Sequence, residues 1–312
     1  MLKVGLVGVG GISTEHIRCW DRYESAELTS ICDIREERLN MHPSKKHYTD
    51  FDLMLDSEDF DIIDICLPTY MHTEFALKCL KKGINVICEK PISLNKDDVD
   101  LIYNTAKENG VKFMVAQVLR FWPEYEFIKE VYDDERYGKL LAGKMSRLGS
   151  YPKWSWDNWY TDPERSGLVP FDLHIHDLDF MVYSFGNPKV DNSIKVIRDD
   201  NYYMANTYNF GDFSIVSEAS WYNSPYPFVS PFVFNFEKAV IALENGSFKV
   251  YESNGKVTDL RSSSSVEGEV SIPTGSAYYN EIKYFADCVI NDKEPDRVKP
   301  EELKRVIEIL NR

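Results

Sequence analysis

The stretch VGLVGVGGIS (Val4–Ser13) decides how the first third of the chain is interpreted. It begins as an apolar run of strand type and ends where helical spacing starts. Gly8 permits a tight turn between the two, and Gly10 and Gly11 leave backbone amides open to an anion at the start of the helix. With Ser13 in place of the third glycine, the stretch is typical of the phosphate-binding turn of a dinucleotide-binding βαβ unit.

Asp33 strengthens this interpretation. It ends the second strand-like run, about 20 residues beyond the glycine turn, where a carboxylate can bind the ribose hydroxyls of a dinucleotide. The same charge repels a 2′-phosphate, although Arg35 nearby softens that repulsion. We therefore expect a nicotinamide dinucleotide cofactor, NAD in preference to NADP. The alternative is that Asp33 only caps the helix that follows.

Strand-like runs and helical segments alternate through residues 1–119. The expected strands are Lys3–Val7, Leu28–Asp33, Ile62–Cys66, Asn85–Cys88 and Lys112–Ala116. The expected helices are Ser13–Tyr23, Asp50–Leu55, Met71–Lys82 and Lys96–Asn109, with Asn95 as a candidate N-cap. This alternation predicts an α/β fold that opens with a Rossmann domain, in which a parallel sheet is covered on both faces.

The pattern changes over residues 120–312. Helices are expected at Glu124–Tyr132, Pro170–Phe185, Ser276–Asn291 and Pro300–Leu310. Short, aromatic-rich strands are expected between Ser193 and Leu260, with hairpin turns at Asn245–Gly246 and Asn254–Gly255, and a loop over Arg261–Gly275. The second part is therefore predicted to be an α+β domain with a largely antiparallel open sheet, used for substrate binding and oligomerisation.

Composition limits the classes of function. The 312 residues are 43% hydrophobic and carry a net charge of −15, which argues against a nucleic-acid partner. The six cysteines form no C-x-x-C pair, so free thiols in a reducing compartment are expected rather than a disulfide or zinc framework. No apolar run reaches membrane-spanning length and no signal-peptide pattern opens the chain, so we expect a cytoplasmic protein without a membrane partner.

The stretch VICEKPIS (Val86–Ser93) places two charges where a buried strand ends. In a Rossmann sheet, ligands lie beyond the carboxyl ends of the strands, so Glu89 and Lys90 are expected near the nicotinamide. Pro91 restricts the backbone after Lys90 and is a candidate for a cis peptide bond. A surface ion pair between the two charges would be worth little and would explain neither the proline nor the position.

Three motifs together resemble the Gfo/Idh/MocA oxidoreductase family, named after glucose–fructose oxidoreductase and inositol dehydrogenase. They are GLVGVGGISTEH at the start, ICLPTYMHTEFALKCLKKGINVICEKPIS in the centre and SGLVPFDLHIHDLDF further on. The resemblance covers essentially the whole chain and implies hydride transfer between a nicotinamide and a hydroxyl or keto carbon of a sugar, cyclitol or related polyol. The implied cofactor-binding residues are Gly8, Gly10, Gly11, Ile12, Asp33, Leu67, Pro68, His72, Glu89 and Lys90.

The segment PFDLHIHDLDFMVYSFG carries the expected active-site helix. A buried stripe falls at helical spacing: Phe171, Ile175, Leu178, Val182 and Phe185. One position along, Asp172 and His176 share a face at i, i+4, whereas His174 points elsewhere. These polar residues can instead be the border of an amphipathic helix. Alternatively, His174 and His176 can be the His-x-His pair of a metal hydrolase, which would need a strand here.

The expected chemistry is alcohol oxidation, in either direction. His176 takes the hydroxyl proton, because imidazole titrates near neutral pH. Asp172 positions the hydroxyl or the imidazole, and Lys90 stabilises the developing alkoxide. No metal is required. The competing hypothesis is a catalytically silent NAD-binding sensor or scaffold, which would need none of these three residues.

Two further expectations concern the second domain. Arg120, Tyr151, Trp156 and Trp159 are candidates to line the polyol pocket, although they are equally compatible with a core. Phe232, Phe234 and Phe236 alternate onto one face of a strand, and helices can cover only one face of the sheet. We therefore expect a homodimer or homotetramer formed through the other face, which the family resemblance also implies.

Overall fold

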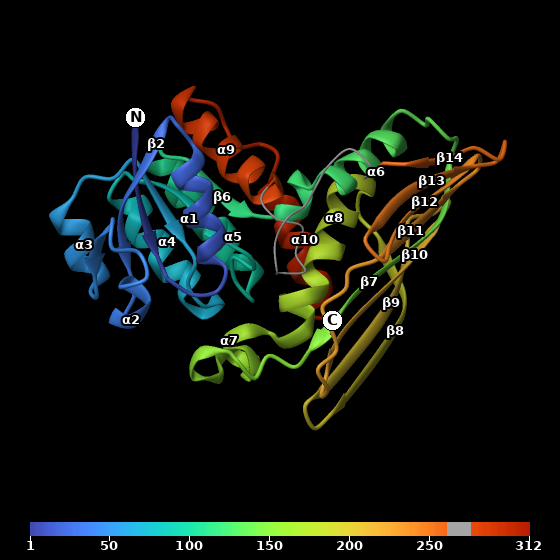
Figure 1. The fold of residues 1–312 in the computed structure, drawn as a ribbon, viewed down its shortest axis with the longest axis horizontal. Helices are drawn as coiled ribbons and strands as arrows, with labels where there is room; N and C mark the ends of the chain where they lie inside the picture. Colours follow the sequence, from blue (N-terminus) through green and yellow to red (C-terminus); the bar gives the residue numbers. More distant parts are fainter. Residues whose placement is uncertain (261–275) are drawn as a thin grey trace. The chain divides into compact units, whose positions relative to one another are not determined.

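The computed structural model describes residues 1–260 and 276–312, which form two compact units. The first contains residues 1–118 and 164–166, helix α9 (Ser276–Ile290) and most of helix α10 (Pro300–Leu310). The second contains residues 119–163, 167–260 and 308–312. Figure 1 shows the elements of both units in chain order. The loop expected over residues 261–275 lies outside the described residues.

The first unit is built on a six-stranded parallel sheet in the order β3-β2-β1-β4-β5-β6. Its strands are β1 (Leu2–Val7), β2 (Ala26–Cys32), β3 (Lys46–Tyr48), β4 (Ile62–Ile65), β5 (Asn85–Glu89) and β6 (Phe113–Ala116). Every residue of β4 and of β6 is buried, as expected of a sheet covered on both faces. The predicted parallel sheet is confirmed; the short strand β3, which is mostly polar and exposed, was not predicted.

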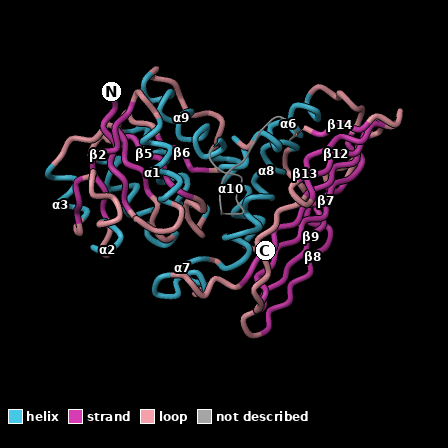
Figure 2. Tube along the Cα trace, in the orientation of Figure 1, coloured by secondary structure: helices cyan, strands magenta, loops and turns pink. Residues whose placement is uncertain are grey.

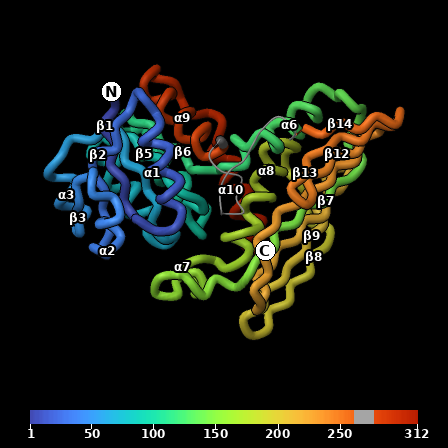
Figure 3. Tube along the Cα trace, viewed as in Figure 1, coloured from blue at the N-terminus to red at the C-terminus, as the bar shows by residue number. Residues whose placement is uncertain are grey.

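Helices cover both faces of this sheet. They are α1 (Ser13–Arg22), α2 (Glu36–Leu39), α3 (Phe51–Ser57), α4 (His72–Lys81) and α5 (Lys96–Glu108). The strand order reverses direction at β1 and β4, so right-handed crossovers place α1 and α4 on opposite faces. The predicted N-cap Asn95 accepts a hydrogen bond from the Asp97 amide. Helix α9, near the end of the chain, packs against α1 (Figure 3).

The second unit contains an eight-stranded sheet in the order β14-β13-β12-β11-β7-β10-β9-β8. The strands are β7 (Leu140–Ser150), β8 (Lys189–Arg198), β9 (Asn201–Asn209), β10 (Ser214–Tyr222), β11 (Phe232–Phe236), β12 (Ala239–Glu244), β13 (Ser247–Glu252) and β14 (Val257–Asp259). Among the described strands of this sheet, only β7 and β10 pair in parallel. The predicted antiparallel character is confirmed, and Asn245–Gly246 turns between β12 and β13 with positive φ at both residues.

The expectation of only short strands, beginning at Ser193, was wrong. Strand β7 lies at the centre of the sheet and runs for 11 residues, and β8 begins at Lys189. Gly143 in β7 explains part of the error, because a Cβ there would lie 3.0 Å from the Phe234 ring and from Ile215. Only a glycine fits at this position. The sequence of β7 therefore lacks the regular alternation of apolar and polar residues by which a strand is recognised.

Helices α6 (Pro123–Asp133) and α8 (Ile175–Phe185) cover one face of the second sheet (Figure 2). Tyr125 of α6 and Phe180 of α8 pack edge-to-face, with ring centroids 4.9 Å apart. Phe232, Phe234 and Phe236 are buried on this helix-covered face. Val216 and Tyr251 belong to the opposite face, where they are 42% and 44% exposed.

The helix expected over Pro170–Phe185 is confirmed in its bounds, but its first turn is not α-helical. Residues Pro170–His174 form a π-helix, η4, and the α-helix begins only at Ile175. Gly167 and Leu168 precede it with φ of 71° and 59°, and Pro170 has no amide proton, so the chain enters the helix through a widened turn. The i, i+4 relation expected of Asp172 and His176 therefore spans a π-turn.

Four short elements remain in the described residues. They are η1 (Thr69–Met71), η2 (Val118–Phe121), η3 (Trp156–Thr161) and α7 (Pro163–Ser166). All six cysteines are buried and free, as predicted. Among the described helices, none has both the length and the apolar character needed to cross a bilayer.

Candidate functional site

The glycine turn lies at the carboxyl edge of the six-stranded sheet, between β1 and α1. Gly8 has φ of +93°, and a Cβ there would lie 2.6 Å from the carbonyl oxygen of Cys66. Gly10 and Gly11 differ, because a Cβ on either would meet no atom within 4 Å. The Ser13 hydroxyl donates to the Gly10 carbonyl oxygen at 2.8 Å, which holds the turn on the helix. An open backbone surface at a helix N-terminus fits the pyrophosphate of a dinucleotide.

Asp33 follows β2 and is 7% exposed. Its Oδ2 accepts the Val9 amide proton at 2.8 Å, so the carboxylate supports the glycine turn. The Arg35 guanidinium contacts both carboxylate oxygens at 3.0 Å. Arg38 donates to the carbonyl oxygens of Val9 and Gly10 at 2.7 and 3.0 Å. Two arginines therefore lie close to Asp33, the carboxylate expected to bind the ribose. Of these, Arg38 was not among the predicted site residues.

His72 links the loops that follow β4 and β5. Its Nδ1 lies 2.8 Å from the Pro91 carbonyl oxygen and its Nε2 lies 2.7 Å from that of Leu67. The ring is 1% exposed, and burial lowers the pKa of His72 despite these two carbonyl contacts. The structure therefore brings His72 together with Leu67 and Pro68, with its ring nitrogens directed at backbone oxygens. Its predicted contact with the cofactor stays a prediction.

Glu89 ends β5 and Lys90 follows it, at the same sheet edge as the glycine turn. The Lys90–Pro91 peptide bond is cis, which confirms that hypothesis. The Glu89 carboxylate is engaged on both oxygens: Oε2 accepts the Lys90 backbone amide at 3.1 Å, and Oε1 lies 2.9 Å from His16 Nε2. Glu89 therefore bonds the backbone of Lys90 and the ring of His16.

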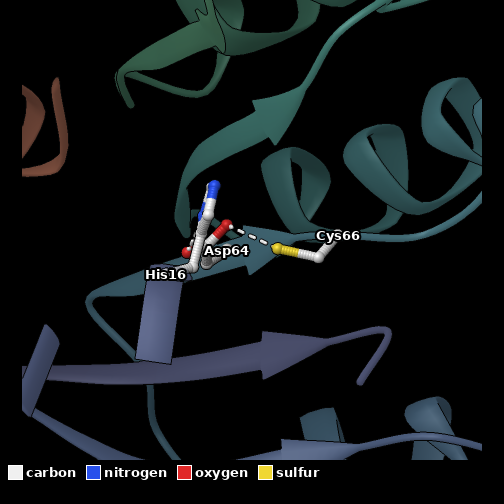
Figure 4. A group of neighbouring side chains, drawn as sticks. All are labelled: His16, Asp64 and Cys66. Atoms are coloured by element: carbon white, nitrogen blue, oxygen red, sulfur yellow. Dashed lines mark hydrogen bonds and ion pairs between the residues drawn. The ribbon is translucent and has the colours of Figure 1, made fainter. Parts of the chain in front are cut away.

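Next to Glu89 lies a buried polar cluster (Figure 4). It consists of His16 in α1, Asp64 in β4 and Cys66, the residue that follows β4. His16 Nδ1 is 2.8 Å from Asp64 Oδ2, which also accepts the Trp20 indole N–H at 2.7 Å. The Cys66 thiol donates to Asp64 Oδ1 at 3.5 Å. His16 and Asp64 are fully buried. His16 belongs to the first of the three family motifs, but its contacts in this cluster were not predicted from the sequence.

The remaining proposed catalytic residues belong to the second unit. Asp172 lies in the π-turn and His176 in the first turn of α8, and both are half-buried. His174, between them, points to the sheet, where its Nε2 lies 2.5 Å from the Tyr208 hydroxyl. Burial and the charge of Arg147 lower the pKa of His174 to about 3, so it stays neutral. His174 is thus directed to the sheet, and its divergence from His176 stays a prediction. The strand required of a metal-binding His-x-His pair is absent from this described segment, which is helical.

Arg120, predicted to line the pocket, is 1% exposed and pairs with Asp179 of α8. Its Nε and its second terminal nitrogen donate to the two carboxylate oxygens at 2.9 and 2.6 Å, and its guanidinium stacks on Tyr183 at 4.6 Å. This bidentate geometry orients both partners. A contact of Arg120 with substrate stays a prediction.

The predicted aromatic residues lie on the segment after β7. Tyr151 packs edge-to-face on Trp221, with ring centroids 5.9 Å apart. Trp159 stacks on Tyr160 at 4.0 Å, while Trp156 is 41% exposed. Tyr151 therefore belongs at least partly to a core, and Trp156 presents the most accessible surface of the three.

Two family models match the chain. Residues 2–117 match the model described as oxidoreductase family, NAD-binding Rossmann fold, and residues 125–225 match the GFO/IDH/MocA C-terminal domain. The chain belongs to the Gfo/Idh/MocA oxidoreductase family. Its first unit is the NAD-binding Rossmann fold of that family, with the open glycine turn described above.

Curated relatives in the family include enzymes with different activities. A 2,7-anhydro-N-acetylneuraminate hydratase of Mediterraneibacter gnavus is 30% identical over 58% of this chain and 48% of the relative. A myo-inositol 2-dehydrogenase of Thermotoga maritima is 30% identical over 59% of this chain and 55% of the relative. The chain spans about half the length of the curated relatives it matches.

Solved structures share the fold over nearly the whole chain. An oxidoreductase from Agrobacterium radiobacter in complex with NAD⁺, L-tartaric acid and magnesium has a TM-score of 0.84 at 17% identity, over 99% of this chain and 94% of the other. A putative myo-inositol dehydrogenase from Sinorhizobium meliloti has a TM-score of 0.80 at 21% identity, over 100% and 95%. At such identities the likeness concerns the fold.

Proposed function

We propose that the protein is an NAD(P)-dependent dehydrogenase or reductase that acts on a CH–OH group of a sugar, cyclitol or related polyol. One observation carries the proposal: the open glycine turn and the Glu89–Lys90 pair follow strands of one parallel sheet at the same edge. At that edge of a dinucleotide-binding sheet, the Lys90 ammonium can stabilise an alkoxide that forms beside the nicotinamide. The family membership and the inositol, apiose and glucose 6-phosphate dehydrogenases among the relatives agree with it.

We propose the following roles for individual side chains. The bound dinucleotide supplies the hydride acceptor. His176 accepts the hydroxyl proton on a ring nitrogen, and Asp172 orients the hydroxyl or that ring. The Lys90 ammonium stabilises negative charge as it develops on the substrate oxygen. Tyr151, Trp156, Trp159 and Arg120 line the polyol pocket.

The cofactor proposal assigns the dinucleotide to Gly8, Gly10, Gly11, Ile12, Asp33, Leu67, Pro68, His72, Glu89 and Lys90. The preference for NAD over NADP rests on Asp33. That preference is moderate, because Arg35 lies on the Asp33 carboxylate and offsets part of its charge.

The proposal extends to organisation of the protein. Residues 1–119, together with α9 and most of α10, form the cofactor domain, and the rest of residues 120–312 supplies substrate binding and assembly. A homodimer or homotetramer forms through the helix-free face of the second sheet, where Val216 and Tyr251 are exposed. The six free, buried thiols suit a cytoplasmic protein.

A substrate panel tests the activity. NAD or NADP is incubated with inositols, aldoses, keto-sugars and amino sugars, and reduced cofactor is followed. Turnover with at least one polyol is expected, whereas cofactor binding without turnover over the panel would favour a sensor. Because one relative is named a hydratase, the panel includes 2,7-anhydro-N-acetylneuraminate, with its product analysed by mass. Gain of water without net cofactor reduction would contradict a dehydrogenase.

A further inference from the structure

The buried ring of His16 is in contact with two carboxyl groups from two different strands. Its Nδ1 is 2.8 Å from Asp64 Oδ2, and its Nε2 is 2.9 Å from Glu89 Oε1. A carboxylate only accepts hydrogen bonds, so two such bonds require protons on both ring nitrogens. The geometry therefore fits an imidazolium that bridges two carboxylates.

The surroundings favour this charge. The titratable side chains that interact with His16 include Cys19 of α1, Asp64 of β4, Cys66 after β4, Glu89 of β5 and Tyr278 of α9, and all of these are acids. Burial disfavours a charged ring, but the charge and hydrogen bond of Asp64, aided by Cys66, hold the pKa of His16 well above its ordinary value. A neutral ring would leave two buried carboxylates close together without a counter-charge.

Asp64 is itself held rigidly. Its Oδ2 accepts the Trp20 indole N–H as well as the His16 contact, and its Oδ1 accepts from the Cys66 thiol. The series of contacts continues from Asp64 through His16 to Glu89, whose other oxygen accepts the backbone amide of Lys90. Each link is a side chain with little freedom to move, because all lie in the buried part of the unit.

We propose that His16 is a positioning residue: as a buried cation between Asp64 and Glu89, it fixes the Glu89 carboxylate and through it the backbone from which Lys90 reaches the reacting oxygen. This inference rests on the proposed role of Lys90. His16 does not touch substrate, so its contribution appears only through Lys90.

The same cluster has metal-ligand spacing, since ligand atoms of His16, Asp64 and Cys66 lie within 4.8 Å of one another. Burial raises the pKa of the Cys66 thiol far above its ordinary value, so it stays protonated, whereas a metal needs the thiolate. Both nitrogens of His16 are directed at carboxylate oxygens. The contacts thus favour an internal ion network over a metal site.

The first test measures the charge of His16 directly. Nitrogen-15 resonances of the imidazole, assigned by their loss in His16→Gln, are recorded on the intact protein from about pH 6 to about pH 8. The account expects both ring nitrogens to stay protonated throughout. A neutral ring at about pH 7, or stoichiometric metal by elemental analysis, would overturn the proposal.

The second test measures coupling to Lys90, using the best substrate of the panel. His16→Gln should lower turnover by about tenfold or more while the NAD dissociation constant changes less than about threefold. In a Lys90→Met background the same substitution should change turnover by less than about twofold, because its effect passes through Lys90. His47→Gln, the same substitution at an exposed position of β3, is the control and should leave turnover near that of the parent.

Equal fractional losses from His16→Gln in both backgrounds would show a general structural role and overturn the inference. If His16→Gln does not fold, Asp64→Asn replaces it in the same cycle and should likewise have no effect in the Lys90→Met background. Failure of the proposed function looks different: the parent protein would then turn over no polyol of the panel, whatever the charge of His16.

Discussion

Asp33 has two kinds of partner, and this shapes cofactor choice. Its carboxylate accepts one hydrogen bond from the Val9 backbone amide and another from the Arg35 guanidinium. Asp33→Ser should narrow the difference between the NAD and NADP dissociation constants, since the charge that repels a 2′-phosphate is lost. Arg35→Ala should widen it, because Asp33 is then left uncompensated. Titration of both cofactors measures this, and tighter binding of NADP than NAD by the parent protein would refute the assignment.

Glu58 offers a residue-scale test of pH dependence. Burial opposes its charge, but contacts from Lys3, Ser30 and Tyr48 lower the pKa of Glu58 to about 2. A glutamate in the unfolded chain titrates near about 4.3, so the stability from this group is complete above that pH and is lost as the pH falls towards 2. Glu58→Gln should lower the free energy of unfolding near neutral pH and weaken its decline in acid.

Urea denaturation across the acid range measures the Glu58 effect. The control is Glu74→Gln, because the Glu74 side chain is 68% exposed on α4 and should leave the curve unchanged. Curves for Glu58→Gln and the parent that run parallel below about pH 4.3 would argue against a contribution from Glu58.

At the scale of elements, the glycine turn allows a matched pair of substitutions. Gly8→Ala places a Cβ against the Cys66 carbonyl at positive φ, and the backbone strain alone costs roughly 1–3 kcal/mol. Gly11→Ala meets no protein atom and should fold normally, yet should weaken NAD binding by occupying the open space. Thermal unfolding and NAD titration separate the two effects. Normal stability of Gly8→Ala, or unchanged NAD affinity of Gly11→Ala, would contradict this view of the turn.

The sequence allowed the regular elements of the first unit to be predicted because each has a simple pattern. Buried strands there read as continuous apolar runs, and Asn95 marks the start of α5. Strand β7 and the π-turn escaped prediction because tertiary packing determines them. In β7, Gly143 is required because a side chain there would crowd the Phe234 ring. The π-turn comes directly after Gly167 and Leu168, which both have positive φ.

Prediction of the site shows the same division. The sequence placed Gly8, Asp33 and Lys90 correctly at strand ends, where motif and position coincide. It did not reveal that His16 meets Asp64 and Glu89, because those contacts join positions far apart in the chain. One signal was present: Asp64 interrupts an otherwise apolar buried strand, and a buried charge requires a partner.

At the scale of the whole molecule, assembly is the main prediction. Light scattering at micromolar concentration should give a dimer or tetramer. Val216→Asp adds charge to the helix-free face of the second sheet and should favour the monomer. Ile34→Asp is the control, because Ile34 is 68% exposed and belongs to the first unit, not to that sheet. A monomeric mass for the parent protein would rule out the predicted assembly.

The most direct test of the proposed activity is the Lys90→Met variant, measured for both turnover and NAD binding with the best substrate of the panel. Methionine retains most of the apolar stem but removes the charge that stabilises the developing alkoxide. Turnover should fall by about 100- to 1,000-fold, because such an interaction strengthens in the transition state. The NAD dissociation constant should change by less than about threefold, since the glycine turn and Asp33 provide most of the binding. Turnover within about threefold of the parent would contradict the catalytic role of Lys90.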